Sequence, residues 1–345
     1  MVTVNKLGIV LSKTQLNFEC IGVLNPAVYK EGNIIFMYYR AIGRNNISTI
    51  GYCELSSPVN VRVRYSEPLL YIQANVENQG LEDPRIVKID DCYYLTFTNF
   101  NGINALGSVA VSKDLLHWEI KGSVVPRISL ATFKQFLGSK LHLIETYLKH
   151  NVSSGVFELE NKRVLLWDKN LIFFPRRIDG KFWILHRIKP DIQVIPFLNS
   201  LEDLTIDYWK YYFSHFEDHI LLSPTYRHES SYIGGGCPPI ETDKGWLLIY
   251  HGVQDTKEGF VYSACAALLD IDDPRIEIAR LPYPLFLPEK EWECSGNVRN
   301  VCFPTGCIID EKVLYIYYGA ADEHIAVASI LIEELLNELL NYKSQ

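Results

Sequence analysis

The sequence predicts an all-β protein, a five-bladed β-propeller that forms a single domain over residues 1–345. Two observations lead to this prediction. One type of segment occurs five times: a proline, a few residues of strand, an acidic or glycine-containing turn, and then an aromatic strand. These segments also recur at intervals of mostly about 60 to 70 residues, which is typical of propeller blades with about four strands each.

The five segments are "NPAVYKEGNIIFMYYRA" (25–41), "GLEDPRIVKIDDCYYLTFTNF" (80–100), "FPRRIDGKFWILHRI" (174–188), "CPPIETDKGWLLIYHGV" (237–253) and "FPTGCIIDEKVLYIYYGA" (303–320). Their turns are marked by Glu31, Asp90, Asp179, Asp243 and Asp310, which stand 59, 89, 64 and 67 residues apart. Each segment continues into a further strand, as in "ISTIGYCEL" after the first. Five such units fill the chain without a linker.

Two stretches fall outside this repeat. The long second interval contains residues 127–151, where apolar residues recur at helical spacing, and the chain closes with an amphipathic helix over residues 329–342. Both helical stretches are interpreted as caps over strand edges. A contact between the subunits of a homo-oligomer is the alternative.

Composition excludes several classes of function. A net charge of −8 argues against sequence-independent binding to nucleic acid, which needs a basic surface. The apolar segments are shorter than the roughly 20 residues of a membrane span, and the first residues make a poor signal peptide. The eight cysteines are scattered without a C-x-x-C pair, which indicates free thiols rather than a metal site. We therefore expect a cytoplasmic protein with no membrane partner and no metal.

The propeller geometry selects candidate site residues. The inner strand of each blade runs along the central channel, so the residue before each proline is expected at one mouth of that channel. These residues are Asn25, Asp83, Phe174, Pro238 and Phe303. Asp83 is the only carboxylate among them. On local evidence alone, Asp83-Pro84 also fits a plain surface turn.

The far ends of the aromatic strands supply a second set of polar groups, among them Arg40, His186, Arg187 and His251. Each has a structural interpretation as well, such as an ion pair for Arg40 or a hydrogen-bonded core histidine for His251. Taken together, a ring of polar groups over aromatic walls indicates a sugar site, because sugar rings stack on aromatic faces and hydroxyls need fixed partners.

Seven segments in the same order resemble glycoside hydrolase family 130, the mannoside phosphorylases and mannosidases. They are "NPAVYKEGNIIFMYYRA", "GLEDPRIVKIDDCYYLTF", "SKDLLHW", "KNLIFFPRRIDGKFWILHRI", "GGGCPPIETDKGWLLIYHGV", "ALLDIDDPRIEIARLPYPLFLPEKEWECSGNV" and "VCFPTGCIIDEKVLYIYYGAADEHI". The resemblance covers residues 24–328 and implies a five-bladed propeller, in agreement with the repeat.

The resemblance implies that Asp83, in the Glu-Asp-Pro motif, is the sole general acid and protonates the glycosidic oxygen through the 3-hydroxyl of the sugar. A positioned acid of this kind contributes about 10²–10⁴-fold to the rate. By the same resemblance, Asn25, Arg40 and Asp322 match positions that bind the glycosyl sugar. His251 is assigned to the same sugar site because it stands at the end of an aromatic strand of the repeat.

The nucleophile distinguishes two reactions. Phosphorolysis requires cations that hold inorganic phosphate, and the resemblance assigns Lys169 and His186 to this task, with Arg187 adjoining. Inverting hydrolysis instead requires a second carboxylate that activates water. Glu229, in the unusual stretch "SPTYRHESSYIGGG", is the candidate for that base.

We therefore expect inverting phosphorolysis of a β-mannoside, either a mannooligosaccharide or a mannosyl-glucose, to α-mannose 1-phosphate. Inorganic phosphate is the co-substrate and no cofactor is required, since no nucleotide-binding glycine pattern is present. A β-mannosidase is the alternative reaction. A propeller that binds glycans without turning them over is the alternative from another class.

Overall fold

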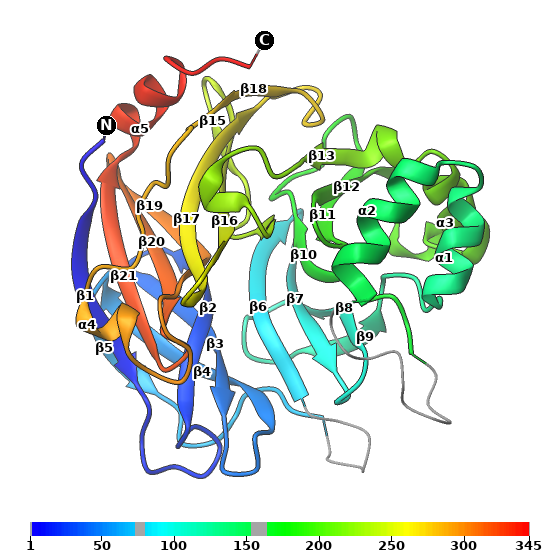
Figure 1. Cartoon of the computed structure of the whole chain (residues 1–345). Helices are drawn as coiled ribbons and strands as arrows, with labels where there is room; N and C mark the ends of the chain where they lie inside the picture. Colours follow the sequence, from blue (N-terminus) through cyan, green and yellow to red (C-terminus); the bar gives the residue numbers. More distant parts are fainter. Residues whose placement is uncertain (1, 73–79, 153–163, 345) are drawn as a thin grey trace.

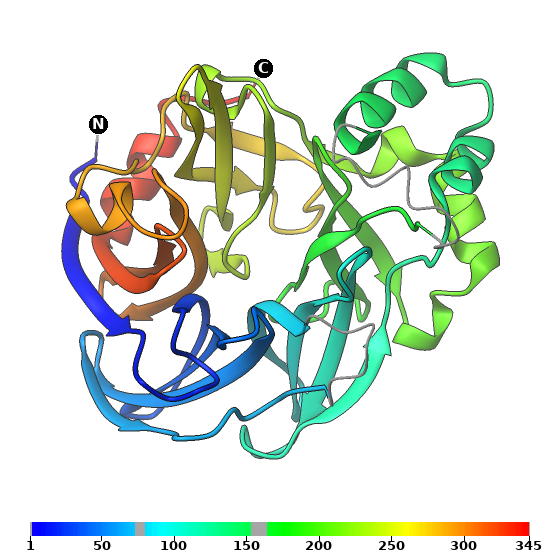
Figure 2. The same ribbon diagram turned by 60° about the horizontal axis from the view of Figure 1, so that its bottom comes forward.

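The computed structural model describes residues 2–72, 80–152 and 164–344, and most of its regular structure is β-strand. The described strands form four hydrogen-bonded sheets. In Figure 2 these sheets stand around a common centre, and their strands are arranged about it in chain order.

The largest sheet has eight strands, and it consists of two antiparallel runs that are joined by one parallel pair, Ser48 with Gly80. The first run contains β2 (Gly22–Glu31), β3 (Ile34–Ile42), β4 (Ser48–Ser57) and β5 (Asn60–Arg64). The second run contains β6 (Gly80–Ile89), β7 (Cys92–Phe100), β8 (Ala105–Ser112) and β9 (Glu119–Ser123).

Two further sheets follow along the chain. One contains β10 (Lys169–Phe173), β11 (Phe182–Arg187), β12 (Ile192–Leu198) and β13 (Ile220–Leu222). The other contains β14 (Tyr232–Gly235), β15 (Ile240–Thr242), β16 (Gly245–Thr256), β17 (Gly259–Leu269) and β18 (Glu277–Arg280).

The last sheet joins the two ends of the chain. It contains β19 (Cys302–Asp310), β20 (Val313–Ala320), β21 (His324–Leu331) and β1 (Asn5–Ser12). The strand β1 pairs antiparallel with β21, so the N-terminal strand completes a sheet that is otherwise C-terminal (Figure 1).

The five predicted aromatic hairpins are present as β2–β3, β6–β7, β10–β11, β15–β16 and β19–β20. Their turns lie at or next to the five predicted turn residues. Asp90 and Asp179 have φ values of 53° and 50°, in the left-handed region that aspartate tolerates in tight turns. In these two hairpins the acidic residue therefore forms the turn for a local reason.

The predicted insert at 127–151 contains two helices, α1 (Leu130–Leu137) and α2 (Leu141–Val152). The Ser129 side chain caps α1 by accepting a hydrogen bond of 3.1 Å from the backbone nitrogen of Thr132. A third helix, α3 (Ile206–Ser214), was not predicted, and it lies with α1 and α2 beside the sheet of β10–β13 (Figure 1). Aromatic side chains of these helices form one core with that sheet.

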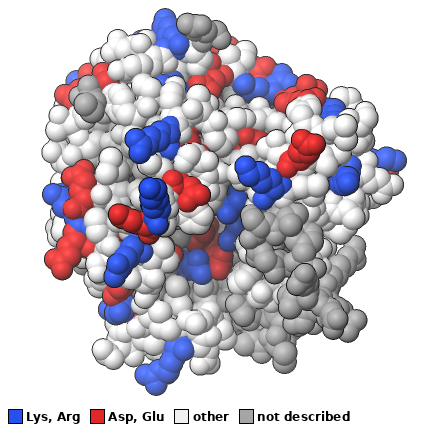
Figure 3. Space-filling model, viewed as in Figure 1, with Lys and Arg blue, Asp and Glu red and all other residues white. Residues whose placement is uncertain are grey.

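The remaining helices are α4 (Glu291–Cys294) and α5 (Ile332–Leu339), and α5 lies within the predicted range 329–342. Leu335, Leu336 and Leu339 of α5 are buried against the core between the last two sheets. Short 3-10 turns occupy Leu201–Asp203, Phe216–His219 and Arg227–Glu229. In the part of the chain that the structure describes, no helix has the length and apolar character needed to span a membrane. Charges of both signs are interspersed on the face shown in Figure 3.

Candidate active site

A charged pocket of about 220 Å³ lies at one end of the inner strands. We call it the site pocket, and it is lined by Asn25, Arg40, Asp83, Lys169, Asn170, Arg187, Tyr232, Tyr262, Val298, Val301, Phe303 and Asp322. These residues come from all four sheets, from the loop before β19 and from the turn between β20 and β21. The pocket therefore exists only where segments distant in sequence meet.

Three strands present a polar residue to the site pocket, and in each strand this residue has the same unusual backbone conformation. Asn25, Asp83 and Asn170 have φ values of 50°, 52° and 51°, and each lies in an irregularity of its strand pairing. Aspartate and asparagine tolerate this left-handed conformation better than most residues do. Such bulges re-aim a side chain and are common beside active sites.

This equivalence corrects one predicted position. The third polar residue at this mouth is Asn170 rather than Phe174, which is fully buried between Trp183 and Trp246. The proline that follows Asn25 and Asp83 marks the bulge in β2 and β6, whereas β10 has its bulge without a proline.

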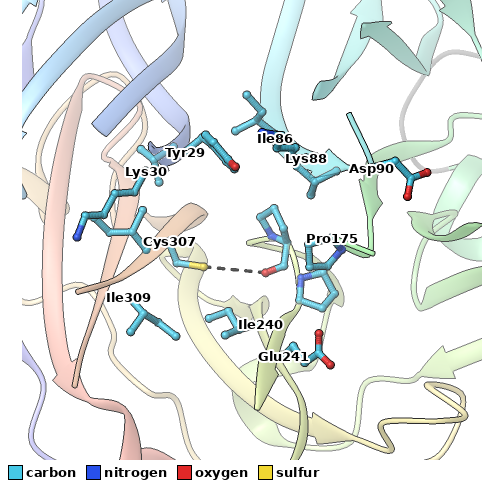
Figure 4. A pocket seen from close by; sticks show the side chains of 15 residues that line it. Tyr29, Lys30, Ile86, Lys88, Asp90, Pro175, Ile240, Glu241, Cys307 and Ile309 are labelled. Atoms are coloured by element: carbon cyan, nitrogen blue, oxygen red, sulfur yellow. Dashed lines mark hydrogen bonds between the residues drawn. The ribbon is translucent and has the colours of Figure 1, made fainter. Parts of the chain in front are cut away.

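A second prediction of this set is also wrong. Pro238 lines another cavity, of about 510 Å³, which we call the distal cavity (Figure 4). Its walls include Val28 of β2, Ile86 of β6 and Ile308 of β19, each three to five residues further along a strand that also lines the site pocket. The two cavities thus lie at opposite ends of the same inner strands.

The carboxylate of Asp83 is 8% exposed and is held by two neighbours. Asn25 Nδ2 donates a hydrogen bond of 2.7 Å to Asp83 Oδ1, and Arg40 Nη1 lies 3.5 Å from the same oxygen. Arg40 also pairs with Glu82 at 2.8 Å and donates to Ser48 Oγ. The structure therefore brings three of the predicted residues, Asn25, Arg40 and Asp83, into direct contact.

Two carboxyl groups of the pocket have opposite pKa shifts. Burial alone would raise the pKa of Asp83, but Arg40, Lys169, Arg85 and the hydrogen bond from Asn25 outweigh it and hold this pKa below its usual value. Burial raises the pKa of Asp322 to about 6. Asp83 is thus ionised at neutral pH, while Asp322 titrates closer to neutral pH.

Two further cations, Lys169 and Arg187, line the site pocket. Lys169 Nζ lies 3.1 Å from Glu82, and the Arg187 guanidinium lies over the Tyr232 ring at 5.2 Å. Lys189 is not among the lining residues, but its Nζ lies 3.8 Å from the centre of the same ring. Burial, with the charges of Arg187 and Lys169, lowers the pKa of Lys189 to about 7. Lys189 was not predicted, although it stands only two residues after Arg187.

The two predicted histidines do not line the site pocket. His186 is fully buried, with Nδ1 at 2.9 Å from both carboxylate oxygens of Asp168 and Nε2 at 2.7 Å from the Tyr212 hydroxyl. Both of its ring nitrogens are therefore engaged by protein groups, and a role in holding phosphate does not fit this placement. The reason is α3, which supplies Tyr212 and encloses the ring.

His251 is also fully buried, and its ring packs against Phe303 with centroids 4.4 Å apart. Burial, with the nearby charges of Arg187, Arg85 and Lys189, holds its pKa well below the usual value, so the ring is neutral. His251 therefore supports the pocket wall from behind instead of facing a ligand.

The predicted alternative base, Glu229, is fully buried away from the site pocket. Its Oε1 accepts hydrogen bonds from the Tyr250 hydroxyl at 2.6 Å and Arg280 Nη2 at 2.9 Å. Its Oε2 accepts from two backbone nitrogens. Possible metal-ligand atoms of Glu229, His228 and Cys265 lie within 4.8 Å of one another. However, the Glu229 carboxylate already forms an ion pair with the guanidinium of Arg280. This cluster therefore does not fit a metal ion.

Several pocket residues had no signal in the sequence pattern. Tyr232 and Tyr262 line the wall and join through their hydroxyls at 2.7 Å, and Val298 and Val301 come from the loop before β19. These positions lie outside the five hairpin segments. Val298 and Val301 belong to segments that resemble family 130, but nothing in the sequence assigned any of the four to the pocket.

The mostly β fold and the buried acid beside a cluster of cations define a pocket suited to a polar, hydroxyl-rich ligand. Comparisons with known proteins then identify the family. The sequence model of glycoside hydrolase family 130, described as beta-1,4-mannooligosaccharide phosphorylase, matches residues 9–341. The chain belongs to this family.

Curated relatives and solved structures agree with this assignment. A 1,2-beta-oligomannan phosphorylase of Thermoanaerobacter sp. (strain X514) is 32% identical over 95% of this chain and 96% of its own. A beta-1,2-mannobiose phosphorylase of the same organism is also 32% identical, over 92% and 93%. The structure of beta-1,2-mannobiose phosphorylase from Listeria innocua has a TM-score of 0.72 at 21% identity and covers 98% of this chain and 99% of its own. At 21% identity, the comparison with the Listeria innocua structure supports the fold alone.

Proposed function

We propose that this protein is a single-domain, five-bladed β-propeller that phosphorolyses a β-mannoside with inversion, giving α-mannose 1-phosphate. The observation that supports this most strongly is the composition of the site pocket. It combines a buried carboxylate held by Asn25 and Arg40 with two further cations, Lys169 and Arg187. Two 32% identical relatives are described as phosphorylases of β-1,2-linked mannosides.

Asp83 is the general acid of the proposed reaction. It gives its proton to the 3-hydroxyl of the mannosyl unit, and that hydroxyl passes its own proton to the glycosidic oxygen as the bond to the anomeric carbon breaks. Arg40, Asn25 and Asp322 hold the hydroxyls of this sugar. Phe303, Tyr232 and Tyr262 supply aromatic faces against which sugar rings pack.

Phosphate is the nucleophile, and Lys169 and Arg187 hold it opposite the leaving group. Attack from that face converts the β-linkage into an α-phosphate. No base is needed because phosphate is already ionised at neutral pH. Since Lys169 lowers the pKa of Asp83, a bound phosphate dianion would offset that charge and raise this pKa. The acid thus gains its proton when both substrates are present.

Hydrolysis is the less favoured reaction. An inverting hydrolase places a second carboxylate about 6.5–9.5 Å from the acid, with room for a water molecule between them. Glu229 is engaged by Arg280 and Tyr250, so it would have to leave a buried ion pair before it could activate water.

The test is an incubation of the purified protein with β-1,2-mannobiose, β-1,4-mannobiose or mannosyl-glucose, each with and without phosphate. We expect α-mannose 1-phosphate only when phosphate is present, and no loss of activity after treatment with EDTA. Free mannose in the absence of phosphate would instead identify a hydrolase. Binding of a mannoside without any turnover would identify a glycan-binding propeller.

A further inference from the structure

Arg85 lies in the interior between the two cavities. It belongs to β6, which contributes Asp83 to the site pocket and Ile86 and Val87 to the distal cavity. Its side chain is only 2% exposed, and its guanidinium lies 5.7 Å from the centre of the Phe303 ring, which lines the site pocket. Arg85 is therefore close to the site without being among the residues that line it.

All three hydrogen bonds of this guanidinium go to backbone carbonyls. Nη1 donates to the carbonyl of Asp83 at 2.7 Å, Nε to that of Gly236 at 2.9 Å and Nη2 to that of Gly235 at 3.2 Å. Asp83 belongs to β6, whereas Gly235 ends β14 of another sheet and Gly236 follows it directly. Arg85 thus ties the strand of the proposed acid to the opposite side of the central channel.

The backbone of Asp83 needs such support. Its φ of 52° lies in the left-handed region, and the strand pairing is interrupted between Glu82 and Arg85. A non-glycine residue in this conformation persists only where its surroundings hold it. Without Arg85, the carbonyl of Asp83 would also lose the hydrogen bond of 2.7 Å that Nη1 donates to it.

The charge of Arg85 has a separate effect. Burying a cation is unfavourable unless nearby groups compensate for it, and peptide carbonyls do so only in part. Burial accordingly lowers the pKa of Arg85 to about 10, while the attraction of the Asp83 carboxylate opposes this change. In return, Arg85 is one of the charges that lower the pKa of Asp83.

We propose that Arg85 is a positioning residue for the general acid: it locks the Asp83 backbone in its left-handed conformation and stabilises the Asp83 carboxylate from beneath the site pocket. This inference rests on the proposed function of Asp83. A guanidinium can do this because its planar group carries several N–H donors, which reach carbonyls on two sides at once. A lysine provides the charge but not this arrangement of donors.

Two substitutions separate the two effects. R85M removes both the charge and the hydrogen bonds, while R85K keeps a charge and loses the bridge between the sheets. In R85K we expect kcat for phosphorolysis to fall by roughly 10- to 100-fold, because a misplacement of about 1 Å has an effect on the order of 10²-fold. KM for phosphate should stay within about threefold, since the cations of the phosphate site are unchanged.

The second readout does not depend on activity. NMR of the protein with ¹³C-labelled aspartate carboxyls, assigned with D83N, measures the pKa of Asp83. We expect this pKa to rise in R85M, because a positive charge that stabilises the ionised form is lost. R85Q replaces R85M if the latter does not fold. If the wild-type protein fails to cleave mannosides, the proposed function fails, but this measurement still decides whether Arg85 acts on Asp83.

Arg64 offers a matched control. It is a partly buried arginine that pairs with Glu19 at 2.9 Å and lies on β5, outside the site pocket. R64M should lower the free energy of unfolding and leave kcat and the pKa of Asp83 unchanged. An unchanged pKa of Asp83 in R85M, or a wild-type kcat in R85K, would overturn the proposal.

Discussion

The two ends of the inner strands differ although the same strands form both. At the site pocket, Asn25, Asp83 and Asn170 adopt left-handed backbone conformations, and charged groups are buried at close range. At the distal cavity, the same strands pair in regular register and present Val28, Ile86 and Ile308, while Lys30, Lys88, Asp90 and Glu241 stand among its lining residues (Figure 4).

This difference separates the part of the fold that supports function from the part that supports stability. Residues in sparsely populated backbone conformations and buried charges both disfavour the folded state, and they persist where a site requires them. Regular pairing with apolar side chains stabilises the fold without such a requirement. Substitutions at the two ends should therefore affect different quantities, and four experiments test this expectation.

The largest effect is expected at Asp83. The D83N variant keeps the shape of the side chain and removes its proton, so kcat for mannoside phosphorolysis should fall by roughly 10²-fold or more. The left-handed backbone at this position should persist, since asparagine also tolerates it. Activity within a few-fold of wild type would show that the Glu-Asp-Pro loop is only a turn.

A smaller effect is expected at the cations. Losing a hydrogen bond to a charged group is unfavourable by about 1.5–3 kcal/mol, so K169A should raise KM for phosphate by roughly ten- to a hundredfold. The affinity for the mannoside, measured by calorimetry without phosphate, should stay nearly constant. The matched control is K30A, which removes a lysine from the distal cavity and should leave KM for phosphate unchanged. Equal effects of the two substitutions would contradict the assignment.

The third experiment concerns pH and Asp322. Because its pKa in the folded protein is raised from 3.8 to about 6, the folded state binds more protons than the unfolded state between these values. The contribution of Asp322 to stability therefore falls as pH rises from about 4 to about 6. Urea unfolding at pH 4.5 and pH 7 should show D322N gaining stability relative to wild type at the higher pH. A difference that is the same at both pH values would argue against the raised pKa.

The smallest effect is expected at the distal cavity. I308V removes one methyl group from a side chain that is 7% exposed, which should lower the free energy of unfolding by about 0.5–1.5 kcal/mol. We expect kcat and both KM values to stay within about twofold of wild type. A larger change in kcat would mean that the distal cavity is coupled to the site pocket through the inner strands.

Part of the site was predictable because its signals are local. Asp83 and Asn25 each precede a proline, and Arg40 ends an aromatic strand at the same place in the repeat. Arg187 stands at the equivalent strand end of the third hairpin and lines the site pocket, whereas Lys169 was assigned by the resemblance to family 130 and not by the repeat. Residues that a repeat places in equivalent positions lie at the same end of their strands, and the sequence alone can therefore group them.

Other predictions failed where a decision depended on contacts between distant segments. His186 was predicted to hold phosphate, but Tyr212 of α3 encloses its ring. Glu229 was the candidate base for the alternative reaction, but it is paired with Arg280. Neither partner is close in sequence. A side chain that can bind a ligand and one that is satisfied inside the core have the same residue type, so only packing distinguishes them.

The sequence by itself determined the five hairpins, their acidic turns and the Glu-Asp-Pro carboxylate, because turn conformation and strand pattern depend on neighbouring residues. Only the tertiary structure decided that Asn170 rather than Phe174 belongs at the site pocket, and that Arg85 lies beneath Asp83. Both depend on the register in which strands pair. A bulge shifts that register by one residue, and it thereby changes which side chains face the pocket.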